Sequence, residues 1–73
     1  MNFVTYQLAM AVRSAVFASL MNAWNDRDDE AKANRHFKQA DHLDSKFKTQ
    51  HGLHYEAYIE RYEEFERKRL HAD

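Results

Sequence analysis

The sequence predicts an all-α protein of three helices, and three observations support this class. The 73 residues include one glycine and no proline, whereas folds rich in β-hairpins need glycine or asparagine at their tight turns. Apolar residues recur at helical spacing in three stretches. Charged residues near the ends of these stretches have the sign that helix termini favour. We expect one small domain, residues 1–73, with helices at about 3–24, 27–50 and 54–71.

The first helix, residues 3–24, is apolar on two faces. Bulky residues form a heptad seam along one face, and smaller residues between Val4 and Ser19 lie roughly opposite. A helix that is apolar nearly all round must be surrounded, and two short helices cannot readily cover both faces. The bulky seam is the predicted interface: Phe3, Tyr6, Met10, Arg13, Phe17, Leu20 and Trp24. The smaller face remains an alternative interface, and a closed bundle around this helix is the alternative fold.

The second and third helices each carry one apolar stripe. In the second helix the stripe contains Ala33, Phe37, Ala40, Leu43 and Phe47, and Asn25 or Asp26 is expected to cap its start. Gly52 is placed to end this helix in the left-handed conformation. The stripe of the third helix contains Tyr55, Tyr58, Ile59, Tyr62, Phe65 and Leu70. We expect the two helices to form an antiparallel hairpin that packs on the first helix.

Arg13 is the only charged residue of the first helix, and its role has two interpretations. Its aliphatic stem can pack in the seam while the guanidinium reaches water. Alternatively, Arg13 forms an ion pair with Asp44, which projects from the stripe of the second helix. Removing either partner of a buried pair strands the other charge. Arg13 and Asp44 are therefore a candidate pair that would orient the interface.

The sequence predicts neither catalysis nor a cofactor. Without cysteine, a zinc site would need histidine and carboxylate ligands on a rigid frame. His51 and His54 flank the expected break at Gly52, and no third ligand is specified, so we expect no metal site. The glutamates of the third helix lie on its polar face, where nothing in the sequence would shift their pKa values toward a catalytic range. No nucleophilic triad or phosphate-binding loop is present in the sequence.

These features favour a non-catalytic protein-interaction module that self-associates or occupies a partner surface as a small accessory factor, subunit or inhibitor. The alternative is a nucleic-acid-binding protein with basic helix ends. A span of the membrane by residues 3–24 is disfavoured because Arg13 lies at the centre of the stretch. We expect a soluble, cytoplasmic protein, with membrane-surface association as a further alternative. The basic residues of the nucleic-acid alternative are Lys46, Lys48, Arg67, Lys68 and Arg69.

Overall fold

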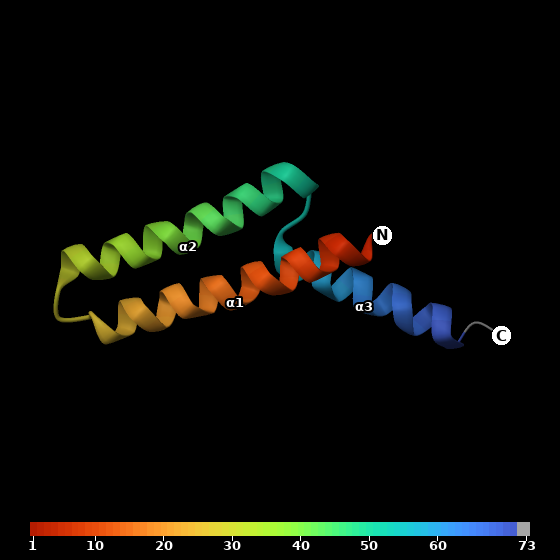
Figure 1. Ribbon diagram of the computed structural model, residues 1–73, viewed down its shortest axis with the longest axis horizontal. Helices are drawn as coiled ribbons and strands as arrows, with labels where there is room; N and C mark the ends of the chain where they lie inside the picture. Colours follow the sequence, from red (N-terminus) through yellow and green to blue (C-terminus); the bar gives the residue numbers. More distant parts are fainter. Residues whose placement is uncertain (72–73) are drawn as a thin grey trace.

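The computed structural model describes residues 1–71 and contains three α-helices. These are α1 (Phe3–Asn25), α2 (Glu30–His51) and α3 (Tyr55–His71). The all-α, three-helix class predicted from the sequence is confirmed. Short turns join the helices into an elongated molecule of 55 × 22 × 15 Å (Figure 1).

Local side-chain chemistry fixes the helix ends. The Asn2 side chain caps α1 by accepting hydrogen bonds from the backbone N–H groups of Val4 and Thr5, at 2.7 and 3.3 Å. Gly52 ends α2 with φ of 76°, as expected for a left-handed cap. The predicted cap at Asn25 or Asp26 is wrong. The N–H of Asp29 bonds to the carbonyl of Asp26 at 2.9 Å, which closes a turn, so Asp29 caps α2 instead.

The α1 and α2 helices pack side by side and antiparallel along a seam of small residues (Figure 1). The buried residues recur every seven positions in both helices, the spacing of coiled-coil packing. Small side chains at these positions allow two helix backbones to approach closely. The buried seam contains Ala9, Val16 and Ala23 of α1 with Ala33, Ala40 and Phe47 of α2.

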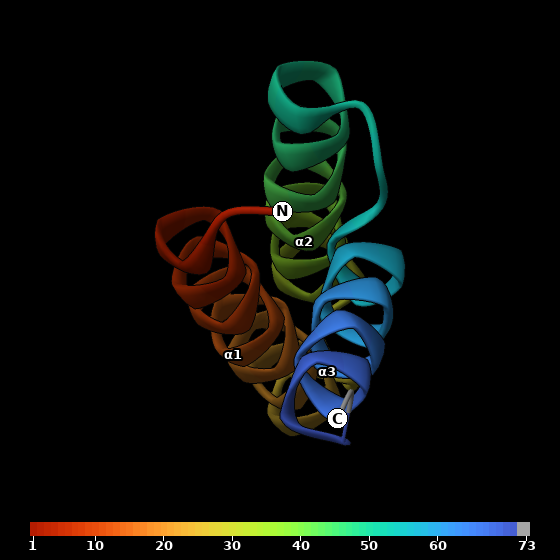
Figure 2. The ribbon, with the colours of Figure 1, turned by 90° about the vertical axis from the view of Figure 1, so that its right-hand side faces the viewer.

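The α3 helix lies across the first half of α1 and meets α2 only beside the turn that joins them (Figures 1 and 2). The rings of Tyr6 and Tyr62 stack with centroids 4.4 Å apart. The Tyr58 hydroxyl accepts a hydrogen bond from the Asn2 N–H at 2.9 Å and donates to the Asn2 carbonyl at 3.2 Å. These contacts direct α3 onto α1 and away from α2.

The expected hairpin of the second and third helices is therefore wrong in detail, because the antiparallel hairpin is formed by α1 and α2. The α2 helix packs on Ala9, Val16 and Ala23, which lie between the two predicted faces of α1, whereas Val4 and Leu8 of the predicted smaller face are exposed. The α3 helix packs on Tyr6 and Met10 of the bulky face. Both connections are short, so loop length alone could not distinguish the two arrangements. Buried Phe47, which packs edge-on against Tyr58 with ring centroids 6.0 Å apart, links the hairpin to α3.

Candidate interaction surface

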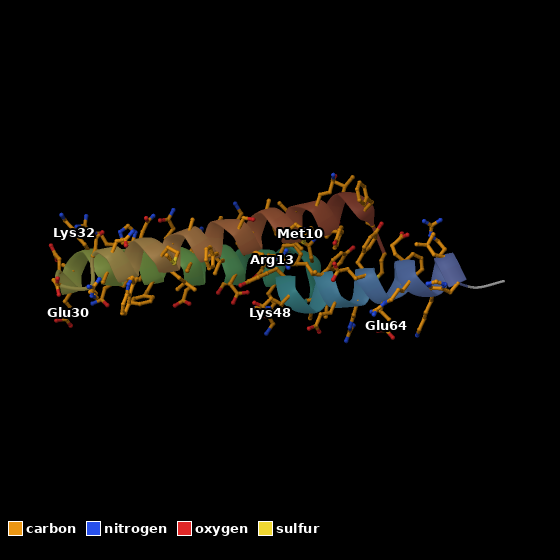
Figure 3. All side chains as sticks on the ribbon, turned by 90° about the horizontal axis from the view of Figure 1, so that it is seen from below. Met10, Arg13, Glu30, Lys32, Lys48 and Glu64 are labelled. Carbon is orange, nitrogen blue, oxygen red and sulfur yellow. The ribbon has the colours of Figure 1, made fainter. Side chains whose placement is uncertain are left out.

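The bulky seam of α1 divides into a covered half and an open half. Tyr6 and Met10 are half-buried where α3 packs on them. Phe17 and Trp24 lie beyond the start of α3 and are 65% and 63% exposed. Figure 3 shows Met10 and Arg13 where α1 passes the start of α3. The seam thus changes from core to surface at about Arg13.

We name the open half the turn-end patch, because it lies beside the turn that joins α1 to α2. All five of its members are large apolar side chains exposed by at least two fifths. An open surface hollow of about 590 Å³ lies over the contact of α1 and α2 here, between Leu20 and Trp24 of α1 and Phe37 of α2. Contiguous exposed apolar surface of this kind marks interaction sites on small proteins. The turn-end patch comprises Phe17, Leu20, Met21 and Trp24 of α1 and Phe37 of α2.

Sequence reasoning missed two members of this patch. Phe37 was expected in the buried stripe of the second helix but is 49% exposed, because the small seam of α1 contacts α2 at Ala33 and Ala40. Met21 lies four residues after Phe17 and three before Trp24, which places it on the same helical face. This spacing could have predicted that Met21 belongs to the exposed patch.

Charged side chains border the patch at the turn. The guanidinium carbon of Arg27 lies 4.6 Å from the centroid of the Trp24 ring, and its Nη1 donates to the Trp24 carbonyl at 3.1 Å. His36 Nε2 lies 2.9 Å from Asp26 Oδ2, which links α2 to the turn. Residues 26–30 contain four acids and one arginine, so the patch has an acidic outer rim.

A second group of exposed apolar side chains lies at the free end of α3. Phe65 and Leu70, expected in the buried stripe of the third helix, are exposed because α3 extends past the start of α1 (Figure 1). Leu70 and Phe3 border a groove of about 590 Å³, which Arg67 and Arg69 also line. Phe3 is thus exposed, but it lies apart from the turn-end patch.

Hydrogen bonds fix the charged side chains around this groove. Arg69 Nη2 donates to Glu66 Oε2 at 2.7 Å, which lowers the pKa of Glu66. The Tyr6 hydroxyl donates to Glu63 Oε2 at 3.0 Å, and this bond to a carboxylate raises the pKa of Tyr6. Burial is the main cause of the raised pKa of Tyr62. The Tyr6–Glu63 hydrogen bond and the Tyr6–Tyr62 stack hold α3 on α1, whereas the Arg69–Glu66 pair lies within α3.

The expected ion pair between Arg13 and Asp44 is not formed within residues 1–71. Asp44 Oδ1 instead lies 2.8 Å from His54 Nε2. The ring N–H does not point along the line to that oxygen, which has no directed hydrogen bond, so this contact is an ion pair only when His54 is protonated. Arg13 is exposed and lies near acids of α3, including Glu56 and Glu60.

The basic residues of the nucleic-acid alternative do not gather on one surface. Lys46 and Lys48 lie near the end of α2, whereas the Arg67–Arg69 segment lies at the far end of α3 (Figure 1). Two of these cations have anionic neighbours: Lys68 lies 3.2 Å from Glu64, and Arg69 lies 2.7 Å from Glu66. No cluster of three or more metal-ligating side chains occurs within the described part of the chain.

By length and composition alone, α1 is long and apolar enough to cross a membrane, and most of it is not buried by the other helices. None of the protein-family models, curated proteins or solved structures compared with the chain matches it. The functional argument therefore depends on the surface of the molecule itself.

Proposed function

We propose that this chain is a non-catalytic protein–protein interaction module, a small subunit, accessory factor or inhibitor, with α1 as its adhesive element. One observation carries the proposal: α1 buries small residues against α2, while the large residues of its turn-end half, including Phe17 and Trp24, are exposed. Tryptophan and other large aromatic side chains contribute most of the binding energy at protein interfaces. Phe17 and Trp24 provide such anchors, and Arg27 beside the Trp24 ring adds a second residue type that interfaces favour.

The same observation favours a protein partner over nucleic acid. The aromatic side chains of the turn-end patch lie beside the acidic turn, which repels phosphate. The exposed Phe3 at the other end of α1 shares its groove with Arg67 and Arg69 but also with Glu63 and Glu66, which offset their charge. The basic ends of α2 and α3 are distant from this patch and from each other (Figure 1). We therefore place recognition at the turn-end patch.

Two matched substitutions of α1 test this function. Phe17→Glu introduces a charge into the exposed patch, so we expect normal helix content in circular dichroism. We expect association of the chain with its protein partner to weaken by about thirtyfold, the loss typical of a hot-spot residue. Met10→Glu places the same charge under α3, where Met10 is half-buried, and we expect it to lower the thermal stability. If Phe17→Glu leaves association unchanged, the patch is not an interaction surface and the proposed function is wrong.

A further inference from the structure

The chain exposes more surface than its mass predicts. A folded monomer of 8.8 kDa is expected to expose about 4,800 Å², whereas this chain exposes 5614 Å². Its Cα radius of gyration is 15.2 Å, compared with about 11 Å expected for a domain of this length. The excess of about 800 Å² is close to the area that one partner buries in an interface of standard size.

Given the proposed function, we propose that the partner of the turn-end patch is a second copy of the same chain. The two α1 helices pack antiparallel about a two-fold axis that passes beside Leu20 and Met21. Phe17 of each copy then lies opposite Trp24 of the other copy. This pairing covers the open half of the bulky seam in both chains, as α3 covers the first half.

The size of the patch fits this assembly. Phe17, Trp24 and Phe37 are each exposed by about half to two thirds, and with Leu20 and Met21 they present about 500 Å² of apolar surface, given side-chain areas of about 150–250 Å² for aromatic residues. Homodimer interfaces are about 65% apolar in area. If the apolar area of about 500 Å² is about 65% of the interface, each copy buries about 800 Å² in total. This area matches the excess of exposed surface.

Charge complementarity sets the orientation. Arg13 lies at the inner end of the patch, where it faces Glu56, Glu60 and Glu63 of α3 without an ion pair. The acidic turn lies at the outer end, so antiparallel pairing brings each Arg13 to the turn of the second copy. Within that turn, Asp26 contacts His36 and Asp29 caps α2. Asp28 has neither role, and no ion pair of Arg13 or Asp28 forms within residues 1–71. Arg13 and Asp28 thus form two symmetric intermolecular ion pairs.

The same charges disfavour a lipid surface as the occupant. Helices that lie on membranes carry lysine and arginine beside their apolar face and bind anionic lipid. The hollow of this patch is lined by one acid, Glu30, and one base, Arg27, and the adjoining turn adds Asp26, Asp28 and Asp29. A second copy can neutralise this rim with its own Arg13, whereas an anionic bilayer would repel it.

A charge exchange tests the register of the pair. In Arg13→Glu both intermolecular pairs become repulsive acid–acid contacts, and in Asp28→Arg both become repulsive base–base contacts. We expect each variant to dimerise about tenfold more weakly than the unmodified chain, since two exposed pairs change sign. An equimolar mixture restores both ion pairs, so heterodimers should form with about the original affinity. Sedimentation equilibrium of each variant and of the mixture, with one component fluorescently labelled, measures this.

Glu64→Arg serves as the control partner, because Glu64 is exposed on α3 away from the patch and pairs only with Lys68. Its heterodimer with Arg13→Glu contains one ion pair and one repulsive contact, so this mixture should reach an intermediate affinity and not the original one. Circular dichroism of every variant establishes that it is folded. The inference is overturned if folded Arg13→Glu and Asp28→Arg fail to recover affinity when mixed, or if the unmodified chain floats with anionic vesicles and stays monomeric. If Phe17→Glu still weakens association after such a failure, the interaction function stands and only the two-fold register falls.

Discussion

Replacing Phe47 by alanine is expected to remove a large part of the protein's stability, because this side chain joins all three helices. Phe47 is 2% exposed and lies in one core cluster with Ala9 and Tyr58. Deleting a buried phenylalanine ring costs about 3–5 kcal/mol. A domain of 73 residues has a total stability of only about 4–11 kcal/mol. We therefore expect a much lower melting temperature, or no cooperative transition, in thermal circular dichroism.

Phe37→Ala is the matched control on the same helix. Phe37 is 49% exposed, so its removal should change the free energy of unfolding by less than about 1 kcal/mol. Both substitutions are compared in a Phe17→Glu background, since association would otherwise contribute to the apparent stability. Equal losses of stability at the two positions would contradict the placement of Phe47 in the core and Phe37 on the surface.

Enlarging Ala9 is the second change expected to have a large effect. Ala9 is 0% exposed in the seam between α1 and α2, and a leucine there must push the two backbones apart. Overpacking of this kind costs about 1–3 kcal/mol. We expect a lower midpoint in chemical denaturation of Ala9→Leu, because the larger side chain separates α1 from α2.

Ala11→Leu is the control for this substitution. Ala11 is exposed on α1, and alanine and leucine have similar helix propensities, so the midpoint should hardly move. If Ala9→Leu is as stable as Ala11→Leu, α1 and α2 are not closely packed through their small residues.

The secondary structure was predictable because each helix carries its own start, stop and period. Gly52 and the acidic residues of 26–30 predict the two breaks between helices to within a few residues. The pairing of the helices was not predictable from side-chain size. The sequence predicts a hairpin of the second and third helices, yet the closest packing is between α1 and α2, through Ala9, Val16 and Ala23 of α1. Their heptad spacing, matched by Ala33, Ala40 and Phe47, was the signal that could have identified it.

The candidate interface was partly predictable for the same reason. Phe17, Leu20 and Trp24 were expected on an adhesive seam and are exposed. Tyr6 and Met10 of that seam are half-buried because α3 folds back onto them. The contacts that place α3 there are the hydrogen bond of Tyr58 to Asn2 and the stacking of Tyr62 on Tyr6. The interaction function and the cytoplasmic location stay predictions. Phe37 joined the patch only through the packing of α2 on α1, which the sequence does not specify.

The central claim is that α1 keeps its large residues exposed to bind another copy of the chain. Sedimentation equilibrium of the unmodified protein, diluted from about 100 µM to well below about 1 µM, tests it most directly, because interfaces of standard size have affinities from micromolar to picomolar. The account predicts a molar mass near twice 8.8 kDa at the high concentration, falling toward the monomer on dilution. A mass of 8.8 kDa at every concentration would contradict it.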